Sequence, residues 1–304
     1  MTNRRDVFTK LNATKKLPTP SRTALEVMRL CHSETASLNE VAQVIQTDPA
    51  LSAEMLKFAN SAFLATGLQV ASIQKATVKL GMKTVVNLAL CFSLISGNKN
   101  GKSEEFNYGN FWSTSLAQAI AAKTIAGFGK EYDPDEVFVC ALLSHMGQLA
   151  LASLFPHEYD GILVNHPSVK VRENLEKAQF GIDSGELTTE LFLDWGLPAS
   201  YALAAGFYEE LDSVELGEST TKRVAELLYL SYRIARLCHG VKPSPEHLDL
   251  IENMAHGFDV VKGDFSSIFD AIVSRWQEWG QTFNIPTKQC PQYNEIKASV
   301  SETD

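Results

Sequence analysis

The residue best placed for chemistry is a histidine in the middle of the chain. His145 lies at helical spacing from Phe138, Ala141 and Leu142 before it and from Leu149 after it. This spacing places the imidazole on the apolar side of a helix, facing the core. We favour a buried neutral histidine with one or two hydrogen bonds, and the alternative is a ligand to a metal ion or an anion.

Two pairs of neighbouring glutamates are the next residues that could supply an acid and a base. They are Glu104-Glu105 and Glu209-Glu210. Side chains that follow each other on a helix point about 100° apart, so neither pair converges on one reacting atom. Both pairs therefore favour solvated charged faces. The chain also lacks the G-x-S-x-G, G-x-x-x-x-G-K-[ST], G-x-G-x-x-G and H-E-x-x-H motifs of common catalytic and phosphate-binding sites.

The cysteines form neither a metal-binding nor a disulfide pattern. They are odd in number, far apart and mostly embedded in apolar helix patterns: Cys31, Cys91, Cys140, Cys238 and Cys290. Two of them are followed directly by a histidine, whereas zinc sites need two to four intervening residues so that the side chains converge. We therefore predict reduced thiols in a cytoplasmic protein, and no cofactor.

Helical patterns dominate residues 38–94. Asp48 and Pro49 are predicted to open one helix, because a carboxylate accepts from the free N–H groups and proline needs no N–H there. Asn60 and Ser61 are predicted to close it. We favour a structural role in which a buried Asn60 ties down loose backbone. The alternative is that this polar pair lines a groove between two lobes and contacts a ligand.

Further helix signals follow along the chain. Ser72 is predicted to cap a helix that Gly81 ends, and residues 97–105, GNKNGKSEE, have the composition of a linker. A pattern that begins at Asp133 is predicted to continue without a break to about Leu154. A helix of about 20 residues is about 30 Å long, so we expect it to be central.

The two ends of the chain have weaker patterns. Residues 1–16 carry five basic side chains and are predicted to form a solvated, partly mobile leader. Amphipathic helices are predicted between residues 221 and 282, and Trp276 and Trp279 on the last of them favour a packing ridge over a binding platform. Residues 286–304 are predicted to be irregular or disordered.

Composition and charge disfavour several classes of partner. The formal net charge is −9, which argues against nucleic acid because phosphate binding uses clustered lysine and arginine. The longest apolar runs, such as VVNLALCFSLI, are shorter than the 18 or more residues typical of a membrane span. The N-terminus has neither the apolar core nor the cleavage site of a secretion signal. We therefore predict a cytoplasmic protein with no membrane partner.

Three runs in the first third of the chain carry a family resemblance: DPALSAEMLKFANSAF, ASIQKATVKLG and MKTVVNLAL. In this order and at this spacing they resemble the HDOD family, the HD-related output domains of bacterial signalling proteins. The resemblance extends from about Leu17 to about Leu211. It implies an all-helical fold related to the HD metal-dependent phosphohydrolases, generally without their metal ligands.

The resemblance also indicates which residues stand in place of those ligands. A helix histidine of the enzymes corresponds to Thr114, their His-Asp pair to Ser144-His145, another histidine to Ser184, and a late histidine pair to the second glutamate pair. One imidazole with hydroxyl neighbours is too weak a set for a catalytic metal, since open catalytic sites generally use three protein ligands. No catalytic or metal-binding residue is therefore predicted. The candidates for a relic pocket are Thr114, Ser144, His145 and Ser184.

Together these patterns predict an all-α, two-lobed HD-like fold with a C-terminal helical extension. The expected parts are a basic leader, an HDOD-like domain, C-terminal helices packed on its second lobe, and an irregular tail. Their predicted ranges are 1–16; 17–211, with lobe one at 17–96, a linker at 97–105 and lobe two at 106–211; 212–284; and 285–304.

Two hypotheses of function follow, with a third held in reserve. The first is a non-catalytic signal-transduction module that acts through protein–protein interaction with other signalling proteins, with a small-molecule ligand in the relic pocket as a further partner. The competing hypothesis is a metal-dependent phosphohydrolase acting on a nucleotide or a cyclic dinucleotide. The third, a nucleic-acid regulator, is disfavoured by the acidic composition.

Overall fold

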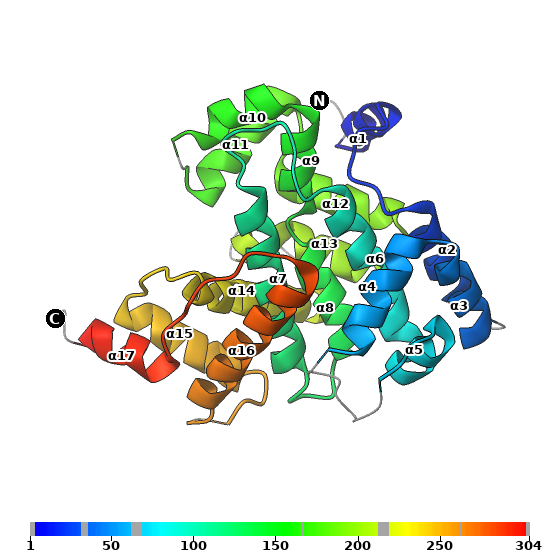
Figure 1. Cartoon of the computed structure of the whole chain (residues 1–304). Helices are drawn as coiled ribbons and strands as arrows, with labels where there is room; N and C mark the ends of the chain where they lie inside the picture. The colour runs from blue at the N-terminus through cyan, green and yellow to red at the C-terminus, as the bar shows by residue number, and fades with distance from the viewer. Residues whose placement is uncertain are drawn as a thin grey trace.

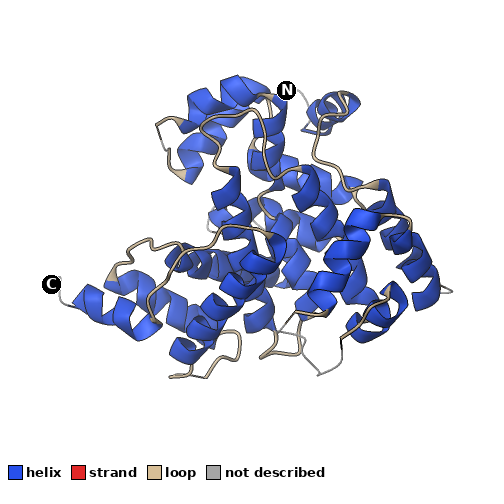
Figure 2. Cartoon of the chain, in the orientation of Figure 1, coloured by secondary structure: helices blue, strands red, loops and turns tan. Residues whose placement is uncertain are grey.

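The computed structural model describes residues 4–31, 36–61, 69–165, 167–211, 219–261 and 263–301. Every regular element in these ranges is a helix, and the ranges contain no strand (Figure 2). The helices form two lobes and a C-terminal extension around one central helix, α7 (Tyr108–Ala126) (Figure 1). The predicted all-α, two-lobed fold is confirmed.

The first lobe lies to one side of α7 and has short helices with strong caps. Asp48 and Pro49 open α4 as expected, and the Asp48 carboxylate accepts a hydrogen bond from Leu51 N at 3.0 Å. Gly81 ends α5 and begins α6 with a φ of +80°, which glycine adopts without strain. The helices of this lobe are α2 (Arg22–Cys31), α3 (Leu38–Gln46), α4 (Pro49–Ala59), α5 (Ile73–Leu80) and α6 (Met82–Gly97).

Asn60 and Ser61 follow α4, and Asn60 ties down backbone as the structural interpretation expects. Its amide Nδ2 donates to Val70 O and its Oδ1 accepts from Val70 N, both at 2.8 Å. Asn60 is exposed, however, so the expectation that it is buried is wrong. The Ser61 hydroxyl has no hydrogen-bond partner among the described residues, and neither residue lines the cavities described below.

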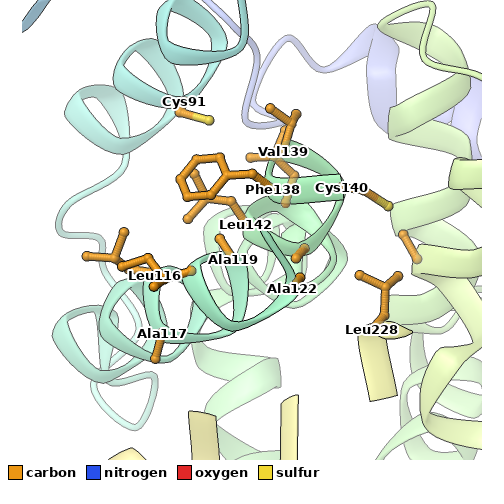
Figure 3. Close-up of a cluster of buried hydrophobic side chains, with 14 of the residues drawn as sticks. Cys91, Leu116, Ala117, Ala119, Ala122, Phe138, Val139, Cys140, Leu142 and Leu228 are labelled. Carbon is orange, nitrogen blue, oxygen red and sulfur yellow. The ribbon is translucent and has the colours of Figure 1, made fainter. Parts of the chain in front are cut away.

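The second lobe is built on α7, whose small and aliphatic side chains pack closely against α8 and, from the extension, α14. Phe138 and Leu142 of α8 face Leu116 and Ala119 of α7 in this core (Figure 3). The other helices of the lobe are α8 (Pro134–Leu143), α9 (Met146–Leu154), α10 (Pro156–Leu163), α11 (Val169–Phe180), α12 (Ser184–Asp194), α13 (Ala199–Phe207) and the short 3₁₀ helix η2 (Tyr208–Glu210).

The single long helix predicted from Asp133 to about Leu154 is wrong, because the chain breaks between α8 and α9. The Ser144 hydroxyl donates to Ala141 O at 2.9 Å, a local bond that competes with the helical backbone. Gly147 then lies so close to α12 that a Cβ there would be 1.9 Å from Ser184 O. The continuous apolar pattern hides this break, which is set by a contact between distant segments.

The C-terminal extension packs on both lobes rather than on the second alone. α14 and α16 lie against α7, and the ring of Trp279 on α16 reaches Phe58 in the first lobe, with centroids 4.7 Å apart. Trp276 and Trp279 are 0% and 3% exposed, so they form a packing ridge as predicted. The extension consists of α14 (Ser219–Cys238), α15 (Pro245–His256), α16 (Phe265–Phe283) and α17 (Tyr293–Ser301).

The predicted irregular tail, 285–304, contains a helix, α17. Tyr293 and Ile296 lie one turn apart and are 2% and 9% exposed, which gives the helix a buried face. The Tyr293 hydroxyl donates to Glu252 Oε1 of α15 at 3.0 Å. The prolines and polar residues around it concealed this short apolar pattern.

The predicted basic leader, 1–16, also contains a helix, α1 (Arg4–Ala13). Phe8 and Leu11 lie three residues apart on one face and are buried, and Arg4 Nε lies 2.7 Å from Glu190 Oε1 of α12. The prediction weighed the basic charges and overlooked this apolar pair, so a mobile leader is wrong for these residues.

Two parts of the described chain are long and apolar enough to be tested as membrane spans. One is Pro134–Leu154, and 83% of its most apolar window is buried inside the protein. The other is the pair α5 and α6, which passes only if the two helices are taken together despite a 114° bend. Both segments are weak evidence of a membrane span, because the buried core helices of a globular fold pass the same test.

Candidate functional site

Two cavities that share part of their lining surround His145 in the second lobe. Their volumes are about 260 Å³ and about 20 Å³, and His145 lines both. Thr114 lines the larger cavity, whereas Ser144 and Ser184 line the smaller one. The structure therefore brings the four predicted pocket residues to one place.

His145 lies at the break between α8 and α9, with its side chain 7% exposed. Its Nε2 is 2.9 Å from Gln118 Oε1 and 3.1 Å from the Tyr208 hydroxyl, and its Nδ1 is 3.4 Å from Gln148 Nε2. Burial lowers the pKa of His145 to about 3, and the nearby charge of Arg172 acts in the same direction. The imidazole is therefore neutral near pH 7, in agreement with the favoured interpretation.

A buried ion cluster beside His145 was missed by the sequence analysis. Arg172 Nε lies 3.3 Å from Glu176 Oε1, and Arg172 Nη2 lies 3.9 Å from Glu209 Oε2. The three side chains are 14%, 0% and 12% exposed, respectively. Burial acts to lower the pKa of Arg172, but the charge of Glu209 and its neighbours raises that pKa above the ordinary value. The guanidinium is thus a permanent cation in this cluster.

Glu209 contradicts the prediction that its pair forms a solvated face. Its Oε1 accepts a hydrogen bond from the Tyr208 hydroxyl at 3.1 Å and lies 3.8 Å from His145 Nδ1. The prediction assumed a surface helix, whereas Tyr208–Glu210 forms a 3₁₀ turn after α13 that carries Glu209 into the site. Burial, aided by the charge of Glu209, raises the pKa of Tyr208, so its hydroxyl keeps its proton.

Glu176 connects α10, α11 and α12 beneath the site. It accepts hydrogen bonds from the Tyr159 hydroxyl at 3.0 Å and from Ser184 N at 2.7 Å. The same carboxyl group also lies 3.3 Å from Arg172 Nε. The i, i+4 spacing of Arg172 and Glu176 was the available signal, but many charges on the same helix obscured it.

The larger cavity has an aromatic side and an amide side. Phe106, Phe111 and Tyr232 supply rings, and the Tyr232 ring centroid lies 5.3 Å from that of His145. Asn107 and Asn110, at the start of α7, supply amide groups. Such a lining suits a small ligand with an apolar ring and a few hydrogen-bonding groups.

The family resemblance implies a fold related to that of metal-dependent phosphohydrolases, whose catalytic ions need about three protein ligands. Among the described residues, no three His, Cys, Asp or Glu side chains converge as a metal site would require. His145 and Glu209 supply two donors, and the Arg172 guanidinium lies beside Glu209. A fixed cation next to two donors opposes a second cation, so these residues do not fit a catalytic metal.

A third cavity, of about 250 Å³, lies where the two lobes meet and has a different lining. Met28, Met82 and Val86 come from the first lobe, and Phe192 and Leu197 from the second. The lining is mainly apolar, with charged groups at one end. Methionine side chains adapt to different shapes, so this surface suits an apolar group of a partner.

Comparison with known proteins is consistent with this architecture. The HDOD domain model matches residues 17–211. The crystal structure of the MmoQ response regulator from Methylococcus capsulatus strain Bath is 34% identical, and the match covers 84% of this chain and 98% of that chain with a TM-score of 0.53.

Two further relatives are more distant. An HDOD domain protein with unknown function from Geobacter sulfurreducens is 20% identical, covers 99% of both chains with a TM-score of 0.69, and shows the fold alone. A curated protein of Treponema pallidum (strain Nichols), described as uncharacterized, is 20% identical over 193 residues, which are 62% of this chain and 36% of that protein. This chain therefore spans little more than a third of that relative's length. The family model matches more than half of the chain and shows that the chain belongs to the HDOD domain family.

Proposed function

We propose that this protein is a non-catalytic signal-transduction module that acts through protein–protein interaction and binds a small ligand in the larger cavity beside His145. The observation that carries the proposal is the placement of Arg172 next to Glu209 and His145. The guanidinium of Arg172 is a permanent positive charge beside Glu209 and His145. A metal-dependent reaction would need metal ligands, rather than a cation, to converge at this point. The response-regulator description of the 34% identical relative supports a signalling role.

The competing function is a phosphohydrolase acting on a nucleotide or a cyclic dinucleotide. Metal-dependent hydrolysis needs an ion that activates water and is held by about three protein ligands with an open position. In this site the His145 imidazole is neutral and could act as a metal ligand. Among the described residues, however, Glu209 is the one carboxylate within 4 Å of the imidazole. The donor set therefore favours binding over hydrolysis.

The cavity between the lobes is the surface that we propose for the protein partner. Its apolar lining comes from both lobes, so an apolar side chain of a partner would contact α6 and α12 together. Lys83, Glu136 and Tyr201 lie at its polar end, where they can orient the partner. Binding at this place would favour one arrangement of the lobes over another.

Hydrolysis is tested with bis(p-nitrophenyl) phosphate in the presence of Mn²⁺, Fe²⁺ or Zn²⁺. We expect no turnover of the wild-type protein above that of His145→Ala, which removes the one imidazole in the site. Turnover that requires a metal ion and disappears in His145→Ala would establish the competing function instead.

Interaction is tested with a photo-crosslinking amino acid placed at Leu197, which lines the cavity between the lobes. Val78 is the matched control, because it is apolar and 70% exposed but does not line this cavity. We expect a discrete crosslinked protein from position 197 and none from position 78 in cells that produce the protein natively. Equal crosslinking at both positions would contradict the proposed surface.

A further inference from the structure

The guanidinium of Arg172 has more hydrogen-bond donors than the described part of the chain satisfies. An arginine side chain carries five N–H groups. Its close contacts with carboxyl groups run from Nε to Glu176 at 3.3 Å and from Nη2 to Glu209 at 3.9 Å. Direct arginine–carboxylate hydrogen bonds are about 2.7–2.9 Å long, and Nε has no hydrogen-bond partner among the described residues. The group is therefore held mainly by charge, and it has N–H donors to offer an acceptor.

The same guanidinium lines both cavities beside His145. A ligand that binds there therefore meets Arg172, and a carbonyl oxygen is a group that accepts from N–H donors. Covering such donors with an apolar group would leave them unsatisfied, which costs free energy. A ligand that supplies an acceptor at this point is favoured over one that does not.

Carboxyl groups outnumber cations around the two cavities. The charged side chains of the lining are Arg172, Glu105, Glu173 and Glu209. Among the described residues, Arg172 is the one cation other than histidine within 4 Å of Glu176 or Glu209. One guanidinium thus faces two glutamates, and a ligand carboxylate or phosphate would add a further negative charge, which Coulomb repulsion opposes. The site therefore favours an uncharged acceptor.

The rings of the larger cavity form one connected wall. The centroid of Phe111 lies 5.3 Å from that of Phe106 and 6.4 Å from that of His145. The centroid of Tyr232 lies 5.3 Å from that of His145 on the same cavity. Aromatic rings pack favourably against each other in offset or edge-to-face geometry. This wall suits a ligand that contains an aromatic ring.

The other polar side chains of the larger cavity can both donate and accept hydrogen bonds. Thr114 supplies a hydroxyl, and Asn110 and Gln148 supply carboxamides. A ligand with a C=O next to an N–H offers a complementary group to either end of such side chains. An aromatic carboxamide or a ring lactam has this arrangement and carries no charge.

We infer that the cavity beside His145 selects an uncharged aromatic carboxamide or lactam, and that Glu209 contributes to this selectivity by repelling anions. The carbonyl oxygen accepts from Arg172, and the ring packs against Phe111 and Tyr232. This inference rests on the proposed function, in which the larger cavity binds a small ligand, and it adds the chemical class of that ligand. It also separates this site from a nucleotide site, since phosphates would bring further negative charge.

The test measures the binding of benzamide and benzoate, which have nearly the same shape and differ in charge. Dissociation constants come from saturation-transfer NMR titrations of the full chain near pH 7 and at low salt, because salt screens the effect of charges. We expect the wild type to bind benzamide at least about tenfold more tightly than benzoate. Acetophenone, which keeps the carbonyl and has neither charge nor N–H, should bind with an intermediate affinity.

Substitutions assign this preference to the site. Glu209→Gln removes one negative charge and keeps the size of the side chain, so we expect benzoate to bind about fivefold more tightly and benzamide to change by less than about twofold. Glu158→Gln is the matched control, because Glu158 is exposed on α10 and lines neither cavity, and it should change neither affinity. Asn110→Trp fills the larger cavity from an exposed position and should abolish benzamide binding.

Three results would overturn the inference. The first is tighter binding of benzoate than of benzamide by the wild type, and the second is a benzoate affinity that Glu209→Gln leaves unchanged. The third is benzamide binding that persists in Asn110→Trp. If Glu209→Gln does not fold, Glu105→Gln takes its place, because Glu105 is exposed and lines the larger cavity. This variant should tighten benzoate binding about twofold, and no tightening would count against the inference.

Failure of the proposed function is seen separately, as metal-dependent turnover of phosphodiester by the wild type. A wild type without such turnover that prefers benzoate defeats this inference alone. Absence of binding by all three probes, with every Kd above about 20 mM, would also overturn the inference, because a one-ring ligand with matched groups should bind more tightly than that.

Discussion

The polar cavity beside His145 and the apolar cavity between the lobes have similar volumes, about 260 and 250 Å³, but they are built differently. Beside the first, buried charges and hydrogen bonds depend on one another, so removing one group leaves others unsatisfied. The second is lined by adaptable apolar side chains that belong to two lobes. Substitutions in the first should therefore reduce stability, whereas substitutions in the second should mainly reduce binding.

The largest effect should follow Glu176→Ala. This change leaves Arg172, the Tyr159 hydroxyl and Ser184 N without their shared acceptor inside the protein. We expect the free energy of unfolding, measured in urea, to fall by about 3–5 kcal/mol. Glu105→Ala is the control, because Glu105 is exposed although it lines the larger cavity, and its effect should stay below about 0.5 kcal/mol. Similar small losses in both variants would contradict the claim that the buried charges beside His145 depend on one another.

The pH dependence of stability should show the burial of His145. Its folded pKa of about 3 is below the unfolded value of about 6.5, so the unfolded chain binds an additional proton between these values. Stability should therefore fall as the pH falls from 7 to 4, by about 3 kcal/mol from this residue alone. Urea unfolding of His145→Gln at both pH values should show a correspondingly smaller loss. An identical pH dependence in the two proteins would mean that His145 is not a buried neutral base.

Adding one methyl group at Gly147, next to the break before α9, should reduce stability. Gly147→Ala would place a Cβ 1.9 Å from Ser184 O and 2.9 Å from Thr188 Oγ1, so α9 and α12 must separate. We expect a loss of about 1–3 kcal/mol in the free energy of unfolding. Gly161→Ala, on α10 with nothing within 4 Å of its added Cβ, should be neutral or slightly stabilising in the same assay. If both variants behave alike, the close contact does not set the break.

The smallest effect should follow Asn60→Ala in the first lobe. The side chain makes two bonds to Val70, but Asn60 is exposed, so water can replace them. We expect a loss of about 1 kcal/mol, seen as a fall of about 2 °C in melting temperature. Asn60→Asp keeps the acceptor for Val70 N and should lose less. A loss as large as that of Glu176→Ala would show that this loop is part of the core.

Local signals in the sequence predicted most of the fold. Asp48 and Pro49 mark the start of α4, and Gly81 marks the turn between α5 and α6, because caps and turns depend on residues within a few positions. The helix α1 was missed because five basic charges received more weight than Phe8 and Leu11. A short apolar pair of this kind stabilises a helix only when another part of the protein buries it.

The site was predicted less completely, for a physical reason. The family resemblance identified Thr114, Ser144, His145 and Ser184, and the structure places them around two neighbouring cavities. Arg172 and Glu176 were not predicted, and Glu209 was predicted to be solvated, because charge compensation joins α11 to a turn far along the chain. Burial of a charge is a property of the folded structure, and neither periodicity nor spacing reports it.

The most direct test of the central claim is the metal content of the wild-type protein purified without chelators. We predict far less than one equivalent of manganese, iron or zinc per chain, with no difference between the wild type and His145→Ala. About one or more equivalents, lost when His145 or Glu209 is replaced by alanine, would contradict the claim that Arg172 supplies the positive charge of this site.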